Sequence, residues 1–164
     1  MAVYSISRWP HLNTLPGPSV IESWLQEADD TVEEDFCEDV HTTLKIFVAL
    51  AKDPKLRKPF NLPGVRKVAP MEFLSIAVLI HANKKKLSMA QLSEAIGLMR
   101  TDVRKNEKDI RQNSRTFKLI LQFLKELKAS KLTPDDDPPA AAVMAKPKTK
   151  RKRAVSPSDE GEWH

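Results

Sequence analysis

Cys37 and His41 lie four residues apart, one turn of an α-helix, a spacing that can bring two zinc ligands together. A structural zinc site needs four ligands, and the chain has no other cysteine. The remaining histidines are distant in the sequence: His11, His81 and His164. We therefore predict no metal site and no cofactor, and we expect Cys37 to be a small buried thiol of the core.

A second candidate site is residues 91–105, which resemble a helix-turn-helix unit. Ser93 precedes Gly97 by four residues and Val103 follows it by six, as in motifs where a glycine turns between two packed helices. In that motif, cations on the second helix can read base edges or contact phosphates. The alternative is one continuous amphipathic helix that tolerates Gly97. The candidate nucleic-acid-binding residues are Arg100, Arg104, Lys105, Lys108, Arg111 and Arg115.

A dense basic run follows Pro147 in a segment rich in proline, alanine and serine. An accessible run of this kind fits the acidic groove of a nuclear import receptor, or a phosphate backbone; the alternative is a charge run that only aids solubility. We predict nuclear localisation, with the cytoplasm as the alternative. The predicted import signal is Lys148, Lys150, Arg151, Lys152 and Arg153.

No arrangement typical of catalysis accompanies these residues. With four glycines, the chain has neither a dinucleotide-binding fingerprint nor a phosphate-binding loop. No serine or cysteine lies in a recognisable nucleophile context. Residues 135–137 are acidic, but they precede Pro138 and Pro139 in a segment expected to lack fixed geometry. We predict that the protein is not an enzyme.

The net charge of +5 and the pI near 9.3 suggest an acidic partner. The charge is unevenly distributed, because residues 19–41 carry nine acids and no lysine or arginine, whereas residues 84–128 are strongly basic. The start of the chain lacks the order of a secretory signal, and the longest apolar run, near residues 73–80, is shorter than a membrane span. We expect an intracellular protein outside the membrane.

Two proline-free stretches, residues 19–53 and 71–133, show an apolar period near 3.6. Helix-start signals occur at Ser19, Thr31, Ser88 and Asn113, and Pro70 suits a first helical position. These patterns predict an all-α fold of five or six helices, with a buried helix near 70–80. In the helix expected at 32–52, the apolar stripe comprises Phe36, Val40, Leu44, Phe47, Val48 and Ala51.

The predicted organisation has three parts. Residues 1–18 contain three prolines and are expected to be irregular, residues 19–131 form the helical domain, and residues 132–164 form a disordered tail with the basic run. Residues 54–69 combine prolines with lysine and arginine and lack a sustained period, which predicts a basic surface loop.

Four short blocks carry a family resemblance: KVAPMEF at 67–73, KKLSMAQLS at 85–93, MRTDVR at 99–104 and DIRQNS at 109–114. Together, over about residues 45–130, they resemble the helical C-terminal region of certain fungal proteins. In that family the region follows an N-terminal domain of the GmrSD restriction-endonuclease type, which has a ParB-like nuclease fold. Nothing in residues 1–45 resembles that domain, so the resemblance implies an accessory helical part and no inherited nuclease residues.

These observations favour a non-enzymatic helical accessory domain that binds DNA, RNA or an acidic protein through a basic surface and tail. The first alternative is a protein-interaction module in which the acidic helix at 32–52 and the basic helices attract each other, within or between chains. The second alternative is sequence-specific DNA binding by the helix-turn-helix.

Overall fold

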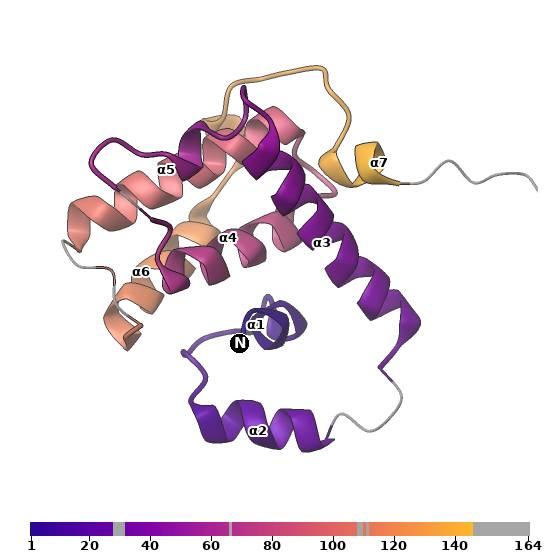
Figure 1. Cartoon of the computed structure of the whole chain (residues 1–164), viewed down its shortest axis with the longest axis vertical. Helices are drawn as coiled ribbons and strands as arrows, with labels where there is room; N and C mark the ends of the chain where they lie inside the picture. The colour runs from indigo at the N-terminus through magenta and orange to yellow at the C-terminus, as the bar shows by residue number, and fades with distance from the viewer. Residues whose placement is uncertain (28–31, 66, 108–109, 111, 146–164) are drawn as a thin grey trace, which may run out of the picture.

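In the computed structural model, which describes residues 1–27, 32–65, 67–107, 110 and 112–145, every regular element is helical (Figure 1). The described residues form seven α-helices, where the sequence predicted five or six. They are α1 (Ala2–Arg8), α2 (Pro18–Glu27), α3 (Glu34–Lys52), α4 (Pro70–Asn83), α5 (Met89–Asn106), α6 (Ser114–Glu126) and α7 (Ala140–Met144), with 3₁₀ turns η1 (Lys58–Phe60) and η2 (Ala129–Lys131).

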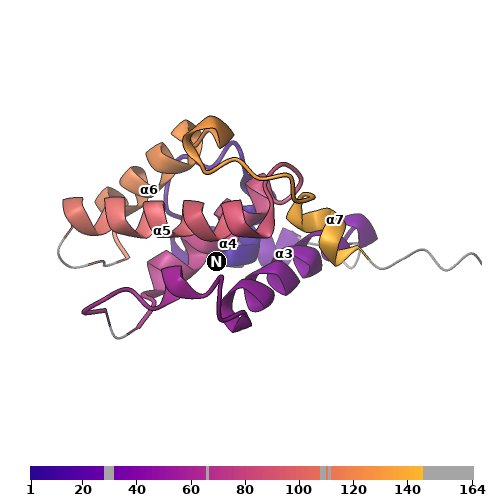
Figure 2. The ribbon, with the colours of Figure 1, turned by 90° about the horizontal axis from the view of Figure 1, so that it is seen from above.

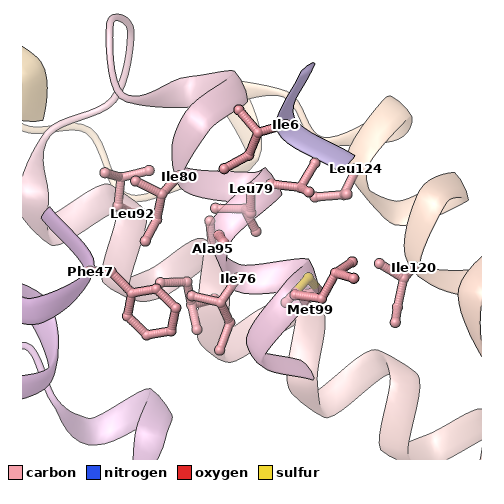
Figure 3. Close-up of a cluster of buried hydrophobic side chains, with 14 of the residues drawn as sticks. Ile6, Phe47, Ile76, Leu79, Ile80, Leu92, Ala95, Met99, Ile120 and Leu124 are labelled. Carbon is pink, nitrogen blue, oxygen red and sulfur yellow. The ribbon is translucent and has the colours of Figure 1, made fainter. Parts of the chain in front are cut away.

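The core is centred on α4, as its nearly continuous apolar sequence predicts. Every residue from Leu74 to Ile80 is buried, and α1, α3, α5 and α6 all pack against this helix. Figure 3 shows α4 side chains such as Ile76 and Leu79 among residues from those neighbours. Because α4 is covered on several sides, its residues need not alternate between polar and apolar.

The predicted helix starts are confirmed at three positions. Pro70 occupies the first turn of α4, where its missing N–H leaves no bond unmade. The Ser88 hydroxyl accepts a hydrogen bond from the Gln91 N–H and the Gln91 side chain reaches back to the Ser88 N–H, which completes a capping box. The Asn113 side chain accepts from the Thr116 N–H at 2.8 Å and so begins α6.

The expectation that residues 1–18 are irregular is wrong for their first half. Helix α1 ends at Arg8, before the first proline, and it packs on α4. Ile6 is 3% exposed and Leu12 is 4% exposed, so apolar burial fixes a segment that has weak local signals.

The prediction of a disordered tail from residue 132 onward is wrong for residues 132–145. Leu132 is buried, and the small residues that open α7 let its backbone approach the turn after α4. There the Ala140 N–H donates to the Leu87 carbonyl and the Ala141 N–H donates to the Lys84 carbonyl, both at 2.9 Å. Residues 132–145 therefore cross the domain as a strap that docks α7 beside α3, and the basic run lies outside the described residues.

Helix α5 is continuous from Met89 to Asn106, and Figure 2 shows it as one uninterrupted ribbon. Gly97 lies within it, so the alternative of one helix is confirmed and the helix-turn-helix interpretation of residues 91–105 is wrong. The glycine packs beside η1, where a Cβ atom would lie 3.7 Å from Pro59 Cγ. The small residue thus faces the loop rather than a turn between two helices.

The buried face of α3 also differs from the prediction. The residues below the surface are Thr43, Ile46, Phe47 and Leu50. Leu44 and Val48 are instead 40% and 51% exposed, and Cys37 is exposed rather than a core thiol. The predicted stripe followed the spacing through Leu44 and Val48, and so omitted Ile46 and Leu50, which share the buried face with Thr43. The Thr43 hydroxyl donates inside the helix to the Asp39 carbonyl.

The continuous α5 predicts opposite effects at two glycines. We expect Gly97→Ala to raise the free energy of unfolding by about 0.5–1 kcal/mol, because glycine costs that much relative to alanine inside a helix. Gly64→Ala should lower it by about 1–2 kcal/mol, because Gly64 has φ of +74°. Urea denaturation followed by circular dichroism measures both. A clear loss of stability in Gly97→Ala would instead favour a turn at Gly97.

Candidate functional site

The arginines proposed to read DNA are used inside the protein. Arg100 is fully buried on α5 and forms a paired interaction with Glu72 of α4, with Nε–Oε1 at 3.0 Å and Nη2–Oε2 at 3.1 Å. Arg104, one turn later, pairs with the same carboxylate through Nε and Nη2, both at 2.8 Å. The Ala69 N–H donates to Oε2 at 2.9 Å. One carboxylate therefore joins two arginines and the start of α4.

The electrostatics of Glu72 follow from these contacts. Burial by itself raises the pKa of Glu72, but the hydrogen bonds from Arg100 and Arg104 outweigh burial and hold the pKa below its ordinary value. Arg100 also donates through Nη1 to the Pro59 carbonyl of η1. The cluster thus connects α4, α5 and the loop that precedes α4.

A second buried cation fixes α3 to the end of α4. Lys84 is 1% exposed, and its Nζ lies 2.9 Å from Asp39 Oδ1, 3.0 Å from the Asp39 carbonyl and 2.7 Å from Thr43 Oγ1. Burial lowers the pKa of Lys84, and the carboxylate of Asp39 opposes that shift. An acid of the predicted helix 32–52 therefore does pair with a basic residue within the chain.

His81 completes this cluster. Its Nδ1 lies 3.0 Å from Asp39 Oδ2 and 3.3 Å from Lys84 Nζ. Burial lowers the pKa of His81, with the Lys84 charge acting in the same direction, which favours a neutral ring. Since Lys84 already has three oxygen acceptors, we assign the Nδ1 proton as a donor to Asp39.

The six predicted nucleic-acid-binding residues do not form one exposed surface. Arg100 is buried, which corrects its assignment, and Arg104 is 26% exposed with its guanidinium bound to Glu72. Arg115 is exposed and pairs with Glu107 at 2.5 Å, and Lys105 is exposed on α5. Lys108 and Arg111 lie outside the described residues, as do the import-signal residues Lys148, Lys150, Arg151, Lys152 and Arg153.

A groove of about 660 Å³ lies between the loop after α3 and one side of α5. Its loop wall contains Leu56, Pro59 and Leu62, and its helix wall contains Ser93 and Gly97. The Ser93 hydroxyl donates to the Leu56 carbonyl at 2.7 Å, which ties the two walls together. This hydrogen bond fixes the loop against α5 and so sets the position of the two walls.

Three cations line this groove within four residues of the loop: Lys55, Arg57 and Lys58. All three are exposed, and none forms an ion pair with a described residue. The one acid in the lining, Glu94, accepts hydrogen bonds from Thr133 of the strap. The sequence predicted a basic surface loop here, and its exposure is confirmed, but only the fold reveals the groove beside it.

The other large groove is less suited to an anion. It lies between α5 and α6 and is lined by two acids, Asp102 and Glu126, with Lys131 as its one cation among the described residues. Across the described ranges, no three histidine, cysteine, aspartate or glutamate residues are placed to hold a metal ion together. The helices of those ranges include none with the length and apolar character needed to span a bilayer.

Comparison with known proteins adds no further assignment. A scan against protein-family models, a search of curated proteins and a search of solved structures each found no match to this chain. The resemblance to the helical region of GmrSD-associated fungal proteins therefore stays a prediction from sequence blocks.

The buried cluster predicts a large effect of neutralising Glu72. We expect Glu72→Gln to lower the free energy of unfolding by about 3–5 kcal/mol, because Arg100 would remain buried without its counter-charge. The matched control is Glu22→Gln, an exposed carboxylate on α2, which should change stability by less than about 0.5 kcal/mol. Equal, small effects of the two substitutions in denaturant titrations would contradict the role given to Glu72.

The pH dependence of the free energy of unfolding, compared between wild type and Glu72→Gln, tests the pKa of Glu72. A carboxylate whose pKa is lower in the folded than in the unfolded state contributes stability above its ordinary value, near pH 4.5, and loses it as pH falls through the lowered value. The stability difference between wild type and Glu72→Gln should therefore be constant near neutral pH and shrink in acid. If the stability difference grew below pH 4.5, the pKa of Glu72 would be raised in the folded state, and the assignment of a lowered pKa would be excluded.

Proposed function

We propose that this chain is a non-catalytic helical domain that binds nucleic acid through phosphate contacts at the basic groove. The observation that carries the proposal is the row of three exposed cations, Lys55, Arg57 and Lys58, without an ion pair among the described residues. Long cationic side chains along one open groove can contact successive phosphates of a nucleic acid backbone. The release of condensed counterions then supplies the driving force for binding.

The separation of charge along α3 supports this choice. The acids Glu34, Asp35 and Glu38 lie at its N-terminal end, whereas the basic loop follows its C-terminal end. A helix of 19 residues is about 28 Å long, well beyond the screening length of about 8 Å at physiological salt. The acidic end therefore repels a phosphate at the groove only weakly.

Sequence-specific reading is not part of the proposal. Direct readout requires side chains that reach base edges from a helix in the major groove. On α5, Arg100 and Arg104 instead bind Glu72, and Lys105 is the exposed cation that follows them. We expect affinity that varies little with base sequence and strongly with salt.

A charge-matched pair of variants tests the groove. The triple variant Lys55→Gln, Arg57→Gln and Lys58→Gln should bind duplex DNA about tenfold or more weakly. The slope of log affinity against log salt, about −0.9 per phosphate contact, should become less negative by about 2.7. The control variant removes three exposed cations, two on α6 and one just after it: Lys118→Gln, Lys125→Gln and Lys128→Gln.

Fluorescence anisotropy with the full chain across a range of salt measures both variants. The control should retain most of the affinity and the slope. Equal losses would show that net charge, not the groove, drives binding. Absence of salt-dependent binding in the wild type would refute the proposed function and favour an acidic protein as the partner.

We further propose that the domain acts in the nucleus, directed there by the basic run at 148–153. Replacing Lys148, Lys150, Arg151, Lys152 and Arg153 with glutamine in a fluorescent fusion should abolish nuclear enrichment. The groove variant is the control and should remain nuclear. Enrichment that survives loss of the run would contradict its role as an import signal.

A further inference from the structure

The exposed face of α3 carries a row of residues at alternating spacings of four and three: Cys37, His41, Leu44, Val48 and Ala51. This is the spacing of the a and d positions of a coiled coil. All five are exposed, and Leu44 and Val48 are the large apolar members. The row lies on the side of α3 away from its buried residues Ile46 and Leu50, and Figure 1 shows the short helix α7 packed beside α3.

The charges beside this row reverse from one end of α3 to the other. Glu38 lies next to Cys37, whereas Lys45 and Lys52 lie next to Leu44 and Ala51. In the heptad that the row defines, these three charged residues share the e position, and e faces e′ in an antiparallel pair. When two copies of α3 pair in opposite directions, Glu38 of each chain lies opposite Lys52 of the other. The two-fold symmetry therefore gives two such ion pairs. In a parallel pair e faces g′ instead, and the g positions Val40 and Phe47 carry no charge, so this ion pair is lost.

We propose that α3 is a dimerisation surface that pairs antiparallel with α3 of a second copy of this chain. In an antiparallel pair an a position faces a d′ position, so Leu44 of each chain meets Val48 of the other, and the two-fold axis passes between these two layers. The two Lys45 side chains flank the axis, where their long stems can diverge into water. A second copy fits better than an unrelated partner because the charges of this face complement themselves on reversal.

The interface is small. A single pair of 19-residue helices buries less than the roughly 1,200–2,000 Å² of typical stable complexes, so we expect a dissociation constant in the micromolar range. This inference is independent of nucleic-acid binding, because it uses the face of α3 and not the groove.

Sedimentation equilibrium over a wide concentration range tests the surface. The wild type should pass from monomer to dimer, and Leu44→Glu should weaken the dimer at least tenfold, because each new carboxylate would be buried against Val48 of the other chain. Leu98→Glu on α5, where Leu98 is 43% exposed, is the matched control and should dimerise normally. A wild type that stays monomeric at several hundred micromolar, or equal effects of both variants, would overturn the proposal. Circular dichroism checks that each variant is folded.

Cross-linking tests the direction of the pair. In the antiparallel arrangement the two Cys37 residues lie about 27 Å apart along the pair, since each is nine residues of rise from the axis, and cannot form a disulfide. Residue 51 faces residue 41 of the second copy, so His41→Cys combined with Ala51→Cys and Cys37→Ser should give a covalent dimer on a non-reducing gel after mild oxidation. Ala51→Cys with Cys37→Ser alone should not cross-link, because the two residues 51 lie about 15 Å apart. Rapid cross-linking of the wild type through Cys37 would indicate a parallel pair and refute the proposed orientation.

Discussion

The arrangement of this protein depends on one buried carboxylate. Glu72 lies in the first turn of the most buried helix, where an unpaired negative charge would be strongly destabilising. Two arginines one turn apart on α5 neutralise it, and Arg100 extends the connection to the Pro59 carbonyl in the preceding loop. Three segments that are distant in sequence are thereby placed in one relative position, and apolar packing around α4 supplies the bulk of the stability.

This constraint has a direct consequence for function. Because Arg100 and Arg104 face inward, α5 serves as a wall rather than as a recognition helix. Exposed cations lie elsewhere, among them Lys55, Arg57 and Lys58 of the loop that the same cluster holds in place. The second buried cation, Lys84, acts similarly on α3 by holding Asp39. Three cations that look surplus in the sequence, Lys84, Arg100 and Arg104, are thus used in internal connections.

The sequence predicted what depends on local signals. The all-helical class, the buried α4 and the starts at Pro70, Ser88 and Asn113 follow from period and capping chemistry, and all are confirmed. What it did not predict depends on tertiary contacts. Short helices such as α1 and α7 have weak local signals and are fixed by burial.

Charged residues were the main source of error at the candidate site. A lysine or arginine is exposed by default, and its burial requires a partner that sequence spacing alone does not identify. One signal was present: Glu72 lies in an otherwise apolar helix and must find a cation, and Arg100 and Arg104 are spaced one turn apart. The groove carries no such signal, because its two walls come from separate segments that meet only in the fold.

Side-chain NMR of the arginines, recorded with and without duplex DNA, tests the central claim most directly. If Arg100 and Arg104 are bound to Glu72, their Nε–H signals should exchange slowly with water and stay unshifted as DNA is added, while the backbone amides of residues 55–58 shift. Rapid exchange of these Nε–H protons, or shifts on DNA binding larger than those of the loop, would contradict the account.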